Sequence, residues 1–227
     1  MELRLGFTGI RRALDLRGLW PGLGRYRNAL VIMLSALLVL GGTLALLRPA
    51  AIPDLAHGNT RGFAAVSTAW ARGDMIVLVR HAERCDHAKV PCLDRPEGIT
   101  ERAQPVAQGL GERFKGLGLD HTDIYSSPLT RAAQTSIFMF GHASYGQDWL
   151  SNCRSNLLRD ALLHKVAGRN LVLVTHSECM ASLERSLKVP NPSLGYGASL
   201  FVSAPPASKP AVMGFIEAAD WPSLTGQ

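Results

Sequence analysis

The chain has 227 residues, of which 47% are hydrophobic, so it is long enough to bury a substantial core. Its formal net charge of +6 is concentrated near the N-terminus, since residues 1–48 hold seven of the 24 Lys/Arg and only two of the 18 Asp/Glu. The remainder of the chain is close to neutral, which argues against a nucleic-acid-binding domain.

An uncharged apolar run of nineteen residues, 29–47, dominates the N-terminal part of the chain. As a helix it would span roughly 28 Å, close to the thickness of the hydrocarbon core of a bilayer. The six arginines before it are Arg4, Arg11, Arg12, Arg17, Arg25 and Arg27. This excess of positive charge predicts a basic cytoplasmic segment at 1–28, a transmembrane signal-anchor at 29–47 and a chain that continues on the other side.

A cleaved signal peptide is the alternative to an anchor. The run is longer than the usual apolar region of a signal peptide, and its only small-x-small site, Thr43-Leu44-Ala45, lies inside the run. Both points favour an uncleaved anchor.

After the anchor, residues 48–73 are rich in Ala, Gly and Pro, which predicts a linker, and a folded domain is predicted over 74–227. The domain starts with a continuous apolar run at 75–80, typical of a central parallel strand, and a long loop follows at 81–98. A helix is predicted from Thr100, as N-cap, to Lys115, with Pro105 in its first turn.

The later elements are predicted from apolar periodicity and from turn residues. In chain order they are a strand at 122–127, a helix at 128–140, a short strand near Trp149-Leu150, a helix at 155–168 closed by Gly168, a strand at 170–176, a helix at 177–188 and a hairpin of strands 199–203 and 211–218. Strands that alternate with helices predict an α/β sheet covered by helices on both faces.

Polar side chains stand at the ends of three predicted strands. Arg80 and His81 end the first, Arg131 follows the second, and His176 ends the strand at 170–176. The carboxyl ends of parallel strands share one edge of a sheet, so these four side chains are expected to converge. Arginine forks suit phosphate oxygens, and a neutral imidazole carries a lone pair that can attack phosphorus. Each residue alone is weak evidence, but together they predict a phosphoryl-transfer site.

Four cysteines, Cys85, Cys92, Cys153 and Cys179, all lie in the part of the chain placed outside the cytoplasm, where disulfides persist. Three pairings are possible. Cys85 with Cys92 would close a short loop beside His81, and Cys153 with Cys179 would then join two later loops. A zinc site is disfavoured because no paired metal-ligand spacing is present.

Three segments carry a resemblance to a known family. "LVRHAE", "YSSPLTRAAQT" and "VLVTH" resemble the hallmark segments of the histidine phosphatase superfamily, in its phosphoglycerate mutase-like branch, over residues 75 to about 217. The resemblance implies a three-layer αβα fold with a mostly parallel sheet. It also implies that His81 attacks a phosphomonoester, that Arg80, Arg131 and His176 bind the phosphate, and that water releases it without a metal or another cofactor.

Within that superfamily, "RHAERCD", "GIT", "NC" and "THSEC" are most similar to the lipopolysaccharide core heptose(II)-phosphate phosphatases, and the four cysteines fall where that subgroup has them. This similarity implies a phosphorylated sugar of the lipopolysaccharide core as substrate. It also implies a bacterial inner-membrane protein with its catalytic domain in the periplasm, or a periplasmic protein if the N-terminal segment is cleaved.

The family's usual proton donor is missing, because Asn152 and Cys153 stand near the position where many members place a glutamate. Glu83 is the first candidate to replace it and Glu178 the second, with Asp86 and Asp148 behind them. Arg84 is a candidate for binding a second anionic group of the substrate, although a solvated basic loop explains it as well.

Other functions are left open by these residues. Cys179 and Arg185 have the C-x5-R spacing of cysteine-dependent phosphatases, but the residues between them contain no glycine and are predicted to be helical. A phosphate-ester-binding module that has lost turnover, and a phosphatase for another extracytoplasmic phosphomonoester, both fit the same motifs.

Overall fold

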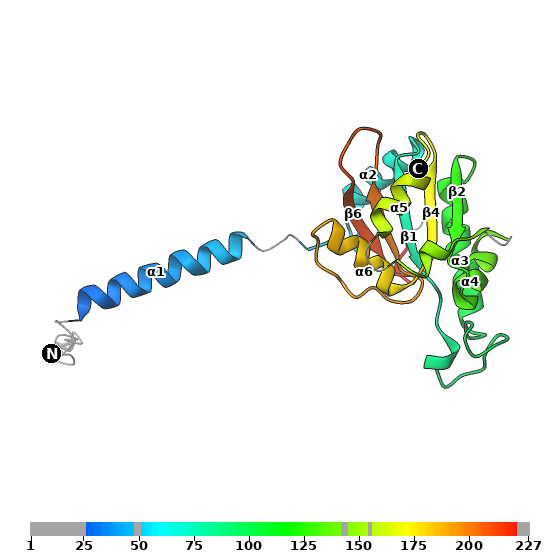
Figure 1. The fold of residues 1–227 in the computed structure, drawn as a ribbon, viewed down its shortest axis with the longest axis horizontal. Helices are drawn as coiled ribbons and strands as arrows, with labels where there is room; N and C mark the ends of the chain where they lie inside the picture. The colour runs from blue at the N-terminus through cyan, green and yellow to red at the C-terminus, as the bar shows by residue number, and fades with distance from the viewer. Residues whose placement is uncertain (1–25, 48–50, 142–144, 154–155, 222–227) are drawn as a thin grey trace, which may run out of the picture. The chain divides into compact units, whose positions relative to one another are not determined.

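The computed structural model describes residues 26–47, 51–141, 145–153 and 156–221. The chain divides into two compact units, Met1–Arg48 and Pro49–Gln227 (Figure 1). The basic N-terminal segment predicted at 1–28 falls almost entirely outside the described residues.

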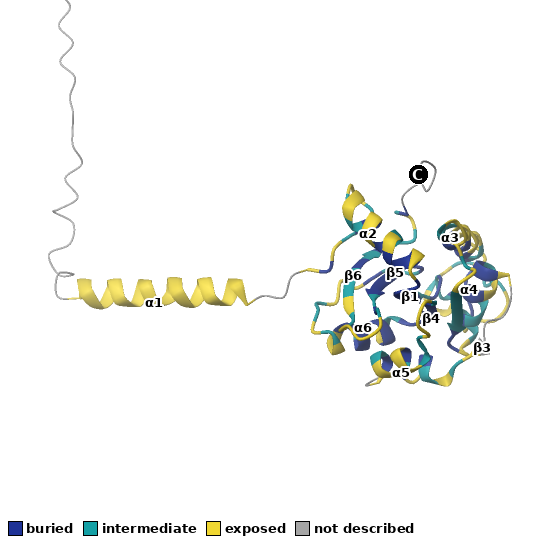
Figure 2. Ribbon diagram, turned by 90° about the horizontal axis from the view of Figure 1, so that it is seen from above, coloured by how far each residue is buried: buried dark blue, intermediate teal, exposed yellow. Residues whose placement is uncertain are grey.

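The first unit contains helix α1, Arg27–Leu46, which coincides with the predicted apolar run. Every one of its residues is exposed, as the uniform yellow of the helix in Figure 2 shows. By length and composition, it is the one helix among the described residues that could cross a membrane. An apolar helix with no polar face is the form that a bilayer accommodates.

The second unit is built on a six-stranded sheet in the order β3-β2-β4-β1-β5-β6. The strands are β1 (Met75–Arg80), β2 (Thr122–Ser126), β3 (Tyr145–Gly146), β4 (Asn170–Thr175), β5 (Ser199–Ser203) and β6 (Ala211–Ile216). The pairs β1–β4, β2–β4 and β2–β3 are parallel, whereas β5 and β6 pair antiparallel as the predicted hairpin. The predicted α/β class with a mostly parallel sheet is confirmed.

Two apolar cores, one on each face of the sheet, create the three layers. Alternate residues of β1 face opposite sides, so Val77 packs in one core and Leu78 in the other. Helices α2, α3 and α4 cover the first core, and α5 and α6 cover the second. These five helices are α2 (Thr60–Ala71), α3 (Ala103–Leu117), α4 (Thr130–Phe140), α5 (Leu157–His164) and α6 (Ser177–Ser186).

Helix α2 corrects the prediction of a linker over 48–73. Asn59 caps the helix by accepting a hydrogen bond from the Gly62 N–H, and the side chains of Phe63, Val66 and Trp70 are buried. The small residues between these apolar positions hide the periodicity of the helix from a reading of the sequence. The folded domain therefore begins well before residue 74.

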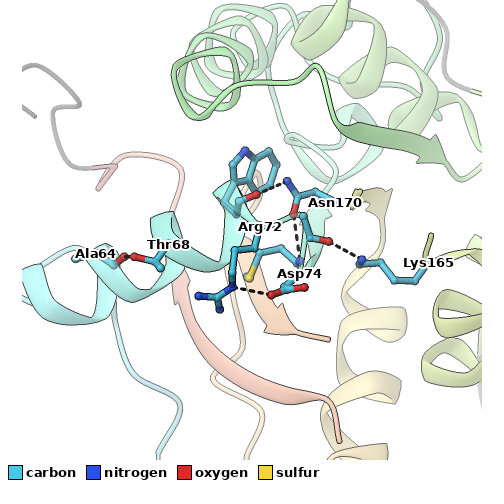
Figure 3. A network of polar contacts seen from close by, with 9 residues as sticks. Ala64, Thr68, Arg72, Asp74, Lys165 and Asn170 are labelled. Carbon is cyan, nitrogen blue, oxygen red and sulfur yellow. Dashed lines mark hydrogen bonds and ion pairs between the residues drawn. The ribbon is translucent and has the colours of Figure 1, made fainter. Parts of the chain in front are cut away.

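A polar network joins the end of α2 to the start of β1 and β4 (Figure 3). The Asn170 side chain accepts from the Met75 N–H at 3.1 Å and donates to the Trp70 carbonyl at 2.9 Å. Lys165 donates to the Gly73 carbonyl at 2.7 Å. Gly73 itself has φ +71°, and a Cβ there would lie 2.2 Å from the backbone of Gly168, so only glycine fits this crossing.

Three predicted boundaries are wrong. Helix α3 has Arg102 rather than Thr100 as its N-cap, because the Thr100 hydroxyl bonds to Glu83 instead; Pro105 does lie in the first turn. Residues Asp148–Leu150 form a 3-10 turn, η4, and not a strand, which occurs at β3. Helix α5 ends at His164, since Lys165 turns to an extended backbone and its ammonium binds two carbonyls.

The cysteines form the disulfides Cys85–Cys92 and Cys153–Cys179, which is one of the three possible pairings. The first closes the loop that contains the 3-10 turn η3 (Cys85–His87), and the second fastens the start of α6 to the segment after η4. With Cys179 bonded and located on a helix, the C-x5-R alternative lacks both a free thiol and a phosphate-binding loop.

Candidate active site

The parallel strands β1, β2 and β4 bring their carboxyl ends to one edge of the sheet, where backbone hydrogen bonds fix the residues that follow. Arg80 is paired in register with Thr175, and the His81 N–H donates to the Thr175 carbonyl at 2.9 Å. The Ser127 N–H donates to the Val174 carbonyl at 2.9 Å. The sheet therefore holds the backbone of Arg80 and His81, and that of Ser127 ahead of Arg131.

His81 is held in one tautomer at the centre of this edge. The residue is 3% exposed, and its Nδ1 lies 2.7 Å from the Ala82 carbonyl, which can only accept a hydrogen bond. Nδ1 therefore carries the proton and Nε2 carries the free lone pair. Arg131 Nε donates to that lone pair at 3.2 Å, which places a guanidinium where the oxygens of an attacked phosphate would lie.

The charge state of His81 suits a nucleophile. Burial lowers its pKa to about 3, and electrostatic effects of His176, Arg131 and Arg80 act in the same direction, although the bond to the Ala82 carbonyl acts in the opposite direction. The imidazole is thus neutral at physiological pH, with its lone pair available for attack.

His176 is the second histidine of the site. Its ring centroid lies 5.2 Å from that of His81, and its Nε2 lies 2.8 Å from Ser127 Oγ. Its Nδ1 is buried and has no hydrogen-bond partner among the described residues. Burial, with the charge of Arg131, lowers the pKa of His176 to about 4, so it too is neutral at physiological pH. A ligand at this edge would supply the partner that Nδ1 lacks.

Arg131 is positioned by the first turn of α4. Thr135, one turn later, donates its hydroxyl to the Arg131 carbonyl at 2.7 Å and accepts from the Ala82 N–H at 2.9 Å. This hydroxyl couples the helix to the residue after His81, so that the guanidinium and the imidazole are placed together.

Arg80 points along the same edge toward the loop before β5. One of its terminal nitrogens donates to the Leu194 carbonyl at 2.5 Å, and its guanidinium carbon lies 4.2 Å from the ring centroid of Tyr196. Its Nε is buried without a partner among the described residues. The Tyr196 ring also lies 5.6 Å from the ring of His81, so this tyrosine lines the site that contains both residues.

Glu83, the first candidate for the proton donor, is occupied by other partners. Its two oxygens accept from the Arg102 guanidinium at 2.6 Å each, and one also accepts from the Thr100 hydroxyl at 2.9 Å. These bonds lower its pKa, so the carboxylate stays ionised and directed to Arg102. This geometry disfavours Glu83 as an acid.

Arg84 and Glu178 lie at the mouth of the site. Arg84 forms a bidentate ion pair with Asp86. It also interacts electrostatically with Arg131 and Glu178. Glu178 acts on the charge of both His176 and Arg131, but hydrogen bonds, first of all from its own backbone N–H, lower its pKa. Glu178 therefore influences His176, yet it too is ionised at neutral pH.

Part of this site lies in a segment that resembles a known protein family. The sequence profile of the histidine phosphatase superfamily (branch 1) matches residues 76–143. That stretch contains all of β1 except Met75, and it includes Arg80, His81 and Arg131. The chain thus resembles the histidine phosphatase superfamily over less than half of its length. His176, the second histidine, lies beyond the matched residues and is assigned by its place at the end of β4.

Curated relatives within the superfamily include the lipopolysaccharide core heptose(II)-phosphate phosphatases of Salmonella paratyphi A and Salmonella typhimurium. Each is 30% identical to this chain over 115 residues, which is 49% of this chain and 57% of the relative. The matched part is thus little more than half the length of these proteins.

Among solved structures, that of the protein histidine phosphatase SixA complexed with tungstate superposes with a TM-score of 0.52. The two chains are 16% identical, and the superposition covers 64% of this chain and 97% of that one. At this identity the likeness establishes the histidine phosphatase fold and nothing further.

Several site residues were not predicted as such. Ser127 and Thr135 lie within the quoted segment that leads to Arg131, but nothing in the sequence shows which hydroxyls turn toward the histidines. Tyr196 stands between two glycines in a loop far from the three motifs, and only the fold brings it to Arg80.

Proposed function

We propose that this chain is a member of the histidine phosphatase superfamily and that it hydrolyses phosphomonoesters through a phosphohistidine formed on His81. The observation that carries the proposal is the contact of Arg131 Nε with His81 Nε2, within a buried and neutral pair of histidines. A nucleophilic nitrogen and a phosphate-binding guanidinium already share one position, so a bound phosphate would meet both.

Two steps complete the reaction. The lone pair of His81 Nε2 attacks phosphorus as the bond from phosphorus to the ester oxygen breaks, and the leaving alkoxide takes a proton. Water then attacks the phosphorus of the phosphohistidine, which restores the neutral imidazole and releases inorganic phosphate. Arg80, Arg131 and the His176 Nδ1–H are the donors offered to the phosphoryl oxygens, on which negative charge gathers during transfer.

Neither of the two candidate glutamates is suited to give the leaving group its proton. Glu83 and Glu178 are both ionised at neutral pH, because their hydrogen bonds lower their pKa values. The proton must then come from solvent or from a group outside these two. An enzyme of this kind favours esters whose alcohols leave easily.

The proposed substrate is a phosphorylated sugar of the lipopolysaccharide core, the substrate that the names of the 30% identical relatives state. Location supports it. Helix α1 is able to span a membrane, the arginines before it favour a cytoplasmic N-terminus, and the two disulfides suit an oxidising compartment. We place residues 1–28 in the cytoplasm, 29–47 in the inner membrane and the folded domain, from α2 onward, in the periplasm.

The test of the reaction uses the full chain in a nonionic detergent and a core oligosaccharide with a labelled heptose phosphate. After rapid quenching in alkali, acid-labile and alkali-stable label is expected on His81, followed by free phosphate. The variant His81→Ala should show neither. Binding of the oligosaccharide without label or release would identify the alternative, a module that keeps the pocket and has lost turnover.

The proposed topology has a separate test. A reporter that is active only in the periplasm should be active when fused after residue 60 and inactive when fused after residue 27. The opposite pattern would place the domain in the cytoplasm and remove lipopolysaccharide as a substrate.

A further inference from the structure

A cavity of about 190 Å³ lies beside the phosphate-binding edge, between α6 and the loop that leads to β5. Its lining residues are Arg80, Ser177, Met180, Glu184, Asn191, Ser193 and Leu194. Ser177, Met180 and Glu184 face it from successive turns of one side of α6. Since one water needs only roughly 10–15 Å³ on this measure, the cavity can hold a group far larger than a bridging water.

Glu184 is the most unusual of the lining residues. It is 1% exposed, and neither of its carboxyl oxygens has a hydrogen-bond partner among the described residues. Burial raises its pKa to about 7, although the charge of Arg185 acts in the opposite direction. Buried carboxyl groups are nearly always paired, so two oxygens without a partner, on a residue that lines a cavity, indicate a missing partner.

Arg80 and Ser177 connect this cavity to the phosphate site. Arg80 immediately precedes His81, and Ser177 immediately follows His176, so each histidine has a neighbour in the cavity wall. The Arg80 Nε is buried and also lacks a partner. The cavity therefore shares Arg80 with the phosphate-binding edge and is lined by the chain neighbours of both histidines.

We propose that the cavity binds the hydroxyl-bearing ring of the substrate, with Glu184 accepting hydrogen bonds from ring hydroxyls. Ser177, Asn191 and Ser193 add side chains that can exchange hydrogen bonds with further hydroxyls. Met180 and Leu194 provide apolar wall for the C–H face of a sugar ring. The lining therefore selects a phosphorylated sugar over a phosphate ester of a plain hydrocarbon, and this inference rests on the proposed phosphatase function.

The test compares three esters on the full chain in detergent. A methyl heptoside monophosphate offers hydroxyls and a poor leaving group, cyclohexyl phosphate offers a ring and a poor leaving group without hydroxyls, and phenyl phosphate offers a better leaving group. Glu184→Gln should lower kcat/KM for the heptoside roughly tenfold or more, the loss expected for a hydrogen bond to a charged group. Both other esters should stay within about twofold of the wild type. Glu112→Gln, which changes an exposed glutamate paired with Lys115, is the matched control.

The other outcomes are distinct. Equal losses of kcat/KM on the heptoside and on cyclohexyl phosphate would show that Glu184 takes part in proton transfer or positions Arg80, and does not bind the sugar. No loss on any of the three esters would also overturn the proposed subsite. If the wild type does not hydrolyse even phenyl phosphate, the proposed function fails on its own. Calorimetry then decides the subsite, because the heptoside phosphate must still bind more tightly than cyclohexyl phosphate, and Glu184→Gln must remove that difference.

Discussion

The free carboxyl of Glu184 makes a prediction about stability that is independent of any substrate. Its pKa is about 7 in the folded protein and 4.5 in the unfolded chain. The folded state therefore holds a proton that the unfolded chain has already lost between these two pH values. Folding stability should be complete below pH 4.5 and should decline as the pH rises to about 7.

The magnitude follows from the same two values. At ~1.4 kcal/mol per pH unit, the interval from 4.5 to about 7 corresponds to about 3 kcal/mol of folding free energy lost at pH 8. Glu184→Gln cannot ionise and keeps the size of the side chain. It should match the wild type near pH 4.5 and exceed it by up to about 3 kcal/mol at pH 8.

The assay is urea unfolding of the full chain in detergent at several pH values, followed through the fluorescence of the buried tryptophans Trp70 and Trp221. The histidines titrate equally in both proteins, so they cancel in the difference between variant and wild type. A difference that stays constant from pH 5 to pH 8 would refute the reasoning, and so would a variant that is less stable at pH 8. Glu112→Gln should give a small, pH-independent difference.

Three further predictions concern catalysis and the disulfides. Because the pKa values of His81 and His176 are about 3 and about 4, kcat/KM should fall on the acid side only below about pH 4. The rates must first be corrected for the substrate phosphate, whose second pKa is about 6; a residual limb near pH 6.5 would contradict the buried, neutral pair. Glu178→Gln should change the hydrolysis of cyclohexyl phosphate less than about tenfold, while wild-type rates rise steeply with the acidity of the leaving alcohol. A loss of about a hundredfold would instead make Glu178 the acid. Replacing Cys153–Cys179 by serines should destabilise the domain by about 1 kcal/mol more than replacing Cys85–Cys92, since it opens a loop of 26 rather than 7 residues. Equal losses of stability in urea unfolding would exclude this explanation by loop entropy.

The edge of the sheet was predictable because short-range patterns determine it. Continuous apolar runs identify β1 and β4 as buried strands, and parallel strands place their carboxyl ends together. Polar residues directly after such runs must then lie at one edge. This is why Arg80, His81 and His176 could be grouped without knowledge of any contact between them.

Residues that enter the site from other segments could not be found in this way. Tyr196 reaches Arg80 from a loop without periodicity, and Glu184 reads as one more charged residue on an amphipathic helix. Likewise Glu83 stands two residues from the nucleophile, but its carboxylate is paired with Arg102, and the two residues meet only because the loop from 81 to 98 folds back. In each case tertiary placement determines the role, and the local sequence does not.

The Arg80 Nε and the Glu184 carboxyl both lack a hydrogen-bond partner among the described residues, and they lie on either side of the boundary between the phosphate site and the cavity. On one side are the phosphate donors around His81, and on the other is the cavity with its buried carboxyl. Leaving both groups without partners costs folding stability, and both residues would touch a phosphorylated ring. If the function were only to bind free phosphate, the unpaired Arg80 Nε would be explained but the carboxyl of Glu184 would not, because a carboxylate repels that ligand. A ligand that carries phosphate at one end and hydroxyls at the other satisfies both groups at once.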